Sequence, residues 1–246
     1  MTHLYLIGIG TGNPDHLTRA AIRTMQQVDL ILIPRKGASK ADLADLRRDI
    51  VAEFAPHTQV AEFDLPTRDP AIPDYLTRVE DWHDQIASIW APIMVGAAKV
   101  ALLVWGDPSL YDSTLRIAGR LTPKPQITLV PGITSIQVMT AAHGIPLNDL
   151  GAPFVVTTGR HLRETGFPLG VDTAIVMLDA DCSFQILPLS DFTIYWTAYA
   201  GMAQEISLSG PLAKMSDQIV TTRAKARADH GWIMDIYLLR RGVAPA

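Results

Sequence analysis

The sequence predicts an α/β protein of two α/β domains, the first with a mostly parallel sheet and the second with a mixed sheet. Through the first half, short apolar runs alternate with segments of helical periodicity, which is typical of a parallel sheet. From about residue 123 the chain carries more strand-like segments, which favours a mixed sheet. We place the domains at 1–126 and 127–246.

The expected elements of the first half begin with Leu4–Ile9, an apolar and branched run that predicts a buried strand. Thr18 can cap a helix over Arg19–Gln27. Further strands are expected at Leu30–Ile33 (ended by Pro34), His57–Leu65 and Val100–Val104, and further helices at Lys40–Glu53 and from Tyr75 to about Val95.

The second half is expected to begin with a strand at Gln126–Val130, followed by the turn Pro131-Gly132. The other expected strands are Phe154–Thr158, Thr173–Met177, Thr193–Trp196, Glu205–Leu208 and Trp232–Leu239, and the expected helices are Ser135–His143 and Leu212–Asp229.

Composition narrows the function classes. A net charge of −4 argues against a nucleic-acid binder, which is usually basic. The single cysteine, Cys182, excludes an internal disulfide framework and suits a reducing compartment. Met1-Thr2-His3 leads directly into the first strand, so we expect no signal peptide, and the apolar runs are too short to span a bilayer. We therefore expect a cytoplasmic protein.

The stretch LYLIGIGTGNPDHLT, residues 4–18, places a glycine-rich turn after the first strand. A dinucleotide fingerprint reads G-x-G-x-x-G, and here Gly8 and Gly10 fit while Asn13 occupies the third position. The second strand also ends in Pro34-Arg35-Lys36 rather than in an acid. These two basic side chains could receive a 2′-phosphate, so an NADP-dependent reductase stays open, as does a tight turn without ligand.

Two further turns follow the later strands of the expected parallel sheet. LLVWGDPSLYDST, residues 102–114, ends a strand in Gly-Asp-Pro, and LVPGITS, residues 129–135, ends another in Pro-Gly with two hydroxyls after it. In this order, the combination GxGxGxPD…LT, GDPxxY and PGITS resembles the tetrapyrrole methyltransferases, also called class III methyltransferases. The resemblance covers essentially the whole chain. It implies two α/β domains that hold S-adenosylmethionine (SAM) in a cleft between them, S-adenosylhomocysteine as product, and a homodimer.

Three stretches resemble most closely the family members of cobalamin biosynthesis, which methylate a precorrin. They are residues 36–50, 105–117 and 155–162. Methylation at another ring position of an earlier precorrin (C11, C17 or C20) stays open. A tetrapyrrole-binding carrier without catalysis is a further alternative, which the GDP and PGITS turns disfavour.

The resemblance implies a set of cofactor-binding residues, most of them acting through backbone atoms. They are Pro14, Trp105, Gly106, Asp107, Leu110, Thr134, Ser135, Leu178, Ala200 and Gly201. Thr134 and Ser135 match a hydroxyl pair that contacts SAM, and Leu178 matches an apolar residue against the adenine. We expect Asp107 to anchor its own turn as well.

The implied tetrapyrrole substrate carries many carboxylates, so an acidic protein must concentrate cations locally. The best clusters are Arg35-Lys36 and the pair Arg160 and Arg163, because guanidinium groups suit carboxylates. Candidates for activating a water molecule are Asp15, Tyr111 and His161. We expect no metal site.

Overall fold

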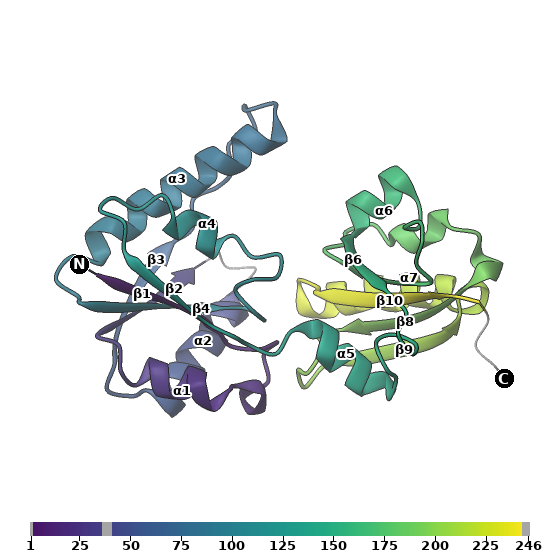
Figure 1. The fold of residues 1–246 in the computed structure, drawn as a ribbon, viewed down its shortest axis with the longest axis horizontal. Helices are drawn as coiled ribbons and strands as arrows, with labels where there is room; N and C mark the ends of the chain where they lie inside the picture. The colour runs from purple at the N-terminus through teal and green to yellow at the C-terminus, as the bar shows by residue number, and fades with distance from the viewer. Residues whose placement is uncertain (1, 36–40, 243–246) are drawn as a thin grey trace. The chain divides into compact units, whose positions relative to one another are not determined.

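The protein is described from a computed structural model, which covers residues 2–35 and 41–242. Residue contacts divide the chain into two units, Met1–Thr134 and Ser135–Ala246. Each unit contains one five-stranded sheet with its own helices (Figure 1).

The first unit is built on a fully parallel sheet in the order β3-β2-β4-β1-β5. Its strands are β1 (His3–Gly8), β2 (Leu30–Arg35), β3 (Gln59–Asp64), β4 (Lys99–Val104) and β5 (Gln126–Val130). Its helices are α1 (Arg19–Met25), α2 (Ala41–Phe54), α3 (Tyr75–Ile93) and α4 (Thr114–Ala118), with the short 3-10 turn η1 at Pro14–His16. The predicted alternation of strands and helices is confirmed.

Strand alternation divides the core of this unit between the two faces of the sheet. Leu4 and Leu6 of β1 pack with α3 and α4, while Ile7 and Ile9 pack with α1 and α2. The helices that follow β1 and β2 therefore cover one face, and those that follow β3 and β4 cover the other.

Local sequence sets the helix starts of this unit. The Thr18 hydroxyl accepts a hydrogen bond from the Ala21 N–H at 3.0 Å, which confirms Thr18 as the cap of α1. The Asp74 carboxylate caps α3 through the Thr77 N–H at 2.7 Å.

Two predicted boundaries in the first unit differ from the structure. Strand β2 continues through Pro34, since it pairs with β3 as far as Arg35 while its pairing with β4 ends at Leu32. The missing N–H of Pro34 therefore leaves no gap in the ladder with β4. Strand β5 pairs with β1, so residues 127–134 belong to the first unit and not to the second.

The second unit has a mixed sheet in the order β6-β7-β10-β8-β9, with only β6 and β7 parallel. Its strands are β6 (Phe154–Thr158), β7 (Thr173–Met177), β8 (Phe192–Ala198), β9 (Ile206–Pro211) and β10 (Asp235–Arg241). Helix α5 (Ser135–His143) packs against β8, β9 and β10, α6 (Gly159–Thr165) against β6 and β7, and α7 (Leu212–His230) against β8 and β9. The predicted mixed sheet is confirmed.

Strand β10 begins later than the predicted strand at Trp232. The Trp232 ring packs against Tyr199 with ring centroids 5.0 Å apart, and its carbonyl accepts a 2.6 Å hydrogen bond from the Tyr199 hydroxyl. The apolar character of Trp232 thus reflects core packing outside the sheet. Helix α6 was not predicted because it is only seven residues long.

Candidate cofactor and substrate site

Three glycines meet at the carboxyl edge of the first sheet. Gly8 ends β1, while Gly106 and Gly132 follow the neighbouring strands β4 and β5. A Cβ atom built on Gly132 would lie 2.1 Å from the Gly106 carbonyl oxygen, and one on Gly8 would lie 2.6 Å from the Gly132 nitrogen. Only glycine lets these three backbones approach so closely.

A second glycine pair joins the loops after β1 and β4. The Gly106 N–H donates to the Gly10 carbonyl at 2.7 Å, and the Gly10 N–H donates to the Gly106 carbonyl at 3.3 Å. Both residues have positive φ, +73° at Gly10 and +67° at Gly106. The glycine-rich loop after β1 is therefore hydrogen-bonded to the loop after β4. This pairing explains why glycine occupies positions 10 and 106 without a dinucleotide fingerprint.

The Asp107 carboxylate serves this junction. It accepts hydrogen bonds from the Ser109 N–H at 2.8 Å and from the Gly132 N–H at 2.9 Å, as well as from the Ser109 hydroxyl. Burial raises the pKa of this carboxyl. The hydrogen bonds from Ser109 and Gly132 lower the pKa by more, so that it falls below its ordinary value. The geometry agrees with the expectation that Asp107 anchors its turn.

Other candidates of the first unit lie on the same edge. Pro14 and Asp15 are exposed in η1, where the Asn13 side chain accepts from the Asp15 N–H at 2.9 Å. Tyr111, in the loop after β4, has a φ of +49° and is 44% exposed, and burial raises the pKa of its phenol. Its hydroxyl therefore stays protonated at neutral pH. Trp105 and Leu110 of this loop and Thr134 are partly buried.

The predicted basic cluster after β2 is only partly described. The Arg35 guanidinium forms two hydrogen bonds with the Asp64 carboxylate, at 2.8 and 3.0 Å, and lies 3.8 Å from Glu62. Lys36 lies outside the described residues. Arg35 already has two carboxylate partners within its own unit, which weakens its case as a receptor for a 2′-phosphate or for a substrate carboxylate.

In the second unit, Leu178 and the pair Ala200-Gly201 follow the carboxyl ends of β7 and β8, which lie on either side of β10. Both strands run antiparallel to β10, so these ends share one edge of the sheet. Leu178 is 66% exposed with a φ of +53°, whereas Ala200 is buried. Gly201 has a φ of +81°, and its N–H donates to the Glu205 carboxylate at 2.6 Å. Ser135 begins α5.

Asp179, which no sequence pattern singled out, organises this edge. Its buried carboxylate accepts hydrogen bonds from the Ser183 hydroxyl and N–H, both at 2.6 Å, and from the Tyr237 hydroxyl at 2.7 Å. A Cβ atom on Gly159 would lie 2.2 Å from the same carboxylate. Burial raises the pKa of Asp179, but the hydrogen bonds outweigh it and hold the pKa below its ordinary value. An acid two residues after a buried strand was the only signal in the sequence.

The basic candidates of α6 differ in their surroundings. The Arg163 guanidinium donates to the Ser183 hydroxyl at 2.7 Å and lies 2.9 Å from Asp181 and 3.4 Å from Asp179. Arg163 thus holds the loop after β7. Arg160 and His161 are exposed in the first turn of the helix, where the His161 N–H donates to the capping Thr158 hydroxyl at 3.2 Å.

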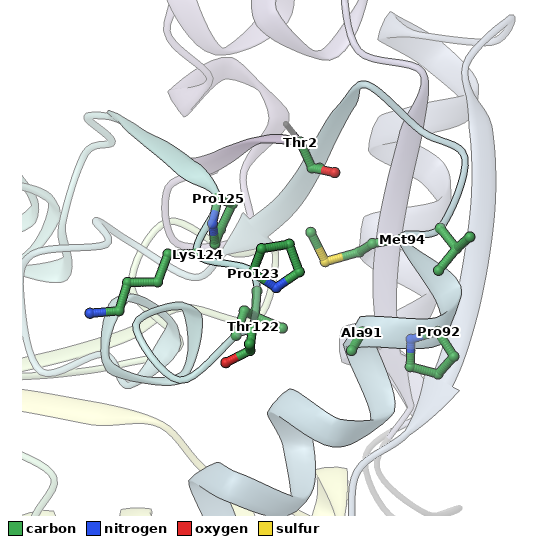
Figure 2. Close-up of a pocket in the computed structure, with 10 residues that line it drawn as sticks. Thr2, Ala91, Pro92, Met94, Thr122, Pro123, Lys124 and Pro125 are labelled. Atoms are coloured by element: carbon green, nitrogen blue, oxygen red, sulfur yellow. The ribbon is translucent and has the colours of Figure 1, made fainter.

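The opposite, amino edge of the first sheet carries an apolar pocket (Figure 2). It is lined by the end of α3 (Ala91, Pro92, Met94), by Thr2, and by the segment 122–125 before β5. Among the described residues, Lys124 is the one charged residue that lines it, and none of the described candidate residues does. The described candidates of the first unit lie instead at the carboxyl edge of this sheet.

In residues 2–35 and 41–242 no group of three or more histidine, cysteine or acidic side chains could hold a metal ion. Over the same residues no helix is long and apolar enough to cross a membrane.

Comparisons with known proteins agree on one family. Residues 3–216 match the family described as Tetrapyrrole (Corrin/Porphyrin) Methylases. Precorrin-6A synthase [deacetylating] of Sinorhizobium sp is 45% identical over 252 residues, covering 98% of this chain and 96% of the relative. Precorrin-2 C(20)-methyltransferase of the same source is 28% identical and covers 58% of this chain and 59% of its own length.

Solved structures share the fold. A cobalamin synthesis related protein (CobF) from Corynebacterium diphtheriae has a TM-score of 0.84 at 35% identity, covering 98% of this chain and 99% of that one. Uroporphyrin-III C-methyl transferase from Thermus thermophilus, complexed with S-adenosylhomocysteine, has a TM-score of 0.60 at 19% identity and covers 97% of each chain.

Proposed function

Because this chain belongs to the tetrapyrrole methylases, a family of SAM-dependent methyltransferases, we propose that it methylates C1 of precorrin-5 and releases the C1-bound acetyl group as acetate, giving precorrin-6A. The observation that carries the proposal is the 45% identity to a precorrin-6A synthase across 98% of the chain. The precorrin-2 methyltransferase, a C20 enzyme, matches only 58% of the chain at 28% identity, which supports C1 over that position.

The residues at the two sheet edges fit SAM in their chemistry. SAM lacks a pyrophosphate, so it needs backbone polar groups, hydroxyls and an apolar surface rather than a phosphate cradle. Gly106, Thr134 and Ser135 supply the first two. Leu178 supplies an apolar side chain that is 66% exposed, at the same edge of the second sheet as the backbone of Ala200-Gly201. We assign these residues, with Pro14, Trp105, Asp107 and Leu110, to the cofactor site.

Methyl transfer from SAM needs little general acid or base catalysis. SAM, when bound, would supply an electrophilic methyl group: as C1 of the macrocycle forms the new bond, the bond from that methyl to sulfur would break and leave S-adenosylhomocysteine. The protein's part is to hold the ring carbon in line with that methyl group. The hydrogen-bonded loops after β1, β4 and β5 provide a rigid edge for this positioning.

Loss of the acetyl group asks more. Water adds to the acetyl carbonyl, the bond to the ring carbon breaks, its electron pair enters the conjugated macrocycle, and acetate leaves. We assign activation of the water to the exposed carboxylate of Asp15 or to the imidazole of His161. The raised pKa of Tyr111 suits it to donating a hydrogen bond to the carbonyl oxygen rather than to acting as base.

We also propose that Arg160 binds a carboxylate of the substrate. Lys36, which lies outside the described residues, stays in the predicted carboxylate-binding set. Arg35 and Arg163 belong to the predicted carboxylate-binding set, and their ion pairs with Asp64 and Asp181 leave them a smaller role. We further propose a homodimer in the cytoplasm; light scattering on the purified protein tests the dimer.

The experiment that tests the function combines binding and turnover. S-adenosylhomocysteine is titrated calorimetrically with NADPH in parallel, and precorrin-5 with SAM is then assayed for C1 methylation and for acetate. Binding of S-adenosylhomocysteine with acetate release supports the proposal. Methylation at C11, C17 or C20 without acetate would refute the assigned position, and binding of NADPH alone would refute the cofactor. Asp15→Asn, Tyr111→Phe and His161→Ala then separate acetate release from methyl transfer.

A further inference from the structure

Arg47 of α2 lies where the first sheet divides at its carboxyl edge. Strand β2 pairs with β4 only as far as Leu32–Leu102, after which β2 continues beside β3 and β4 beside β1. The chain after β2 enters α2 on one face of the sheet, and the chain after β4 enters α4 on the other. In open α/β sheets, ligands bind outside such a point of divergence.

The Arg47 side chain reaches this point from the second turn of its helix. Its Nε donates to the Leu103 carbonyl at 3.0 Å, and its Nη1 donates to the Leu43 carbonyl at 2.8 Å. Leu103 lies one residue beyond the last β2–β4 pair. Arg47 therefore caps a strand carbonyl that β2 no longer serves.

The charge of Arg47 lacks a close partner among the described residues. Burial lowers the pKa of its guanidinium to about 10, and the nearby Asp112 carboxylate partly offsets this. Among the side chains that the structure describes, those of residues 2–35 and 43–242, no carboxylate lies within ion-pair distance of Arg47. Two carbonyls use two of the five N–H groups of a guanidinium, so others are available to an anion. A desolvated cation gains most from an anionic partner.

The neighbouring arginine behaves differently. Arg48 forms ion pairs with Glu62 and Asp45 on the solvent side of α2. The same helix thus carries one arginine with two carboxylate partners. Directly before it is one whose hydrogen bonds, within the described residues, go to the Leu103 carbonyl at the sheet edge and to the Leu43 carbonyl of its own helix. Asp112, the acid that acts on Arg47, directly follows Tyr111, so this edge carries a candidate group of the proposed reaction.

We infer that Arg47 binds a carboxylate side chain of the tetrapyrrole substrate, a role that rests on the proposed function. A planar guanidinium matches a carboxylate through two parallel hydrogen bonds. The bound carboxylate supplies the counter-charge that Arg47 lacks and fixes one side of the macrocycle at the divergence of β2 and β4. Arg47 is thus a substrate-binding residue and takes no part in bond making.

The test is equilibrium binding of precorrin-5 in the presence of S-adenosylhomocysteine, which prevents methyl transfer. Arg47→Gln is compared with Arg48→Gln, which removes the same charge from the adjacent position. Loss of a charge-assisted hydrogen-bond pair raises Kd for precorrin-5 roughly ten- to a hundredfold. We expect this rise in Arg47→Gln alone, with Kd for S-adenosylhomocysteine unchanged in both variants.

Equal Kd values for precorrin-5 in the two variants and the wild type would overturn the role of Arg47. If Arg47→Gln does not fold, Arg47→Lys keeps a donor for the Leu103 carbonyl, and its Kd is expected to rise several-fold; a wild-type Kd would again overturn the role. The proposed function is judged on the wild type alone, by acetate release, so the two failures are distinguishable.

Discussion

The close approach of three backbones at the carboxyl edge predicts a large cost for a single methyl group. In Gly132→Ala, the new Cβ would lie 2.1 Å from the Gly106 carbonyl oxygen and 2.8 Å from the Gly8 carbonyl carbon. Both are backbone atoms, so no side-chain rotation relieves the overlap. The loops must move apart, which also strains the hydrogen bond between the Gly132 N–H and Asp107.

We expect Gly132→Ala to lower the free energy of unfolding of the first unit by about 3 kcal/mol, the upper end of usual overpacking costs. Gly132 does not have a positive φ, so the penalty comes from steric overlap rather than from backbone conformation. Urea unfolding followed by fluorescence of Trp82, Trp90 and Trp105 measures it.

Gly119→Ala is the matched control in the same unit. Its Cβ would meet the Arg116 carbonyl oxygen at 3.5 Å, an ordinary contact, and its φ of −65° is helical. We expect this variant to be unchanged or more stable by about 0.5 kcal/mol. A Gly132→Ala protein as stable as Gly119→Ala would refute the steric reasoning.

Three further results are expected. Asp107→Ala should cost about 1–3 kcal/mol of unfolding free energy, since the N–H of Gly132 loses a charged acceptor; an unchanged urea midpoint would contradict this. Asp179→Asn should cost about 3 kcal/mol, because the buried Tyr237 hydroxyl loses a carboxylate partner, and thermal unfolding measures it. The pKa of Asp179 is depressed in the folded protein, so this carboxylate stabilises the fold fully above its unfolded pKa of about 3.9. The stabilisation is lost as the pH falls through the folded pKa. Asp179→Asn should therefore flatten the acid limb of a plot of unfolding free energy against pH. Leu178→Asn should weaken S-adenosylhomocysteine binding several-fold without loss of melting temperature, because asparagine tolerates a φ of +53° and Leu178 is exposed; calorimetry showing wild-type affinity would remove Leu178 from the cofactor site.

The sequence by itself determined most of the strands and helices and, through its ordered turns, the family. The periodicity of apolar residues and the capping residues are local signals. They predicted, with the observed bounds, the strands at 126–130, 154–158 and 173–177 and the helix at 135–143. The ordered turns after the strands pointed to the tetrapyrrole methylases, which the family match confirms.

Only the tertiary structure decided which charged side chains already have partners within the protein. A carboxylate partner far along the chain leaves no local trace, so the pairing of Arg35 with Asp64 across β2 and β3 was not foreseen. For the same reason the buried role of Asp179 was missed, and so was Arg47, whose position depends on where β2 and β4 part. Local sequence sets conformation, whereas burial and charge balance are set by strand pairing between distant segments.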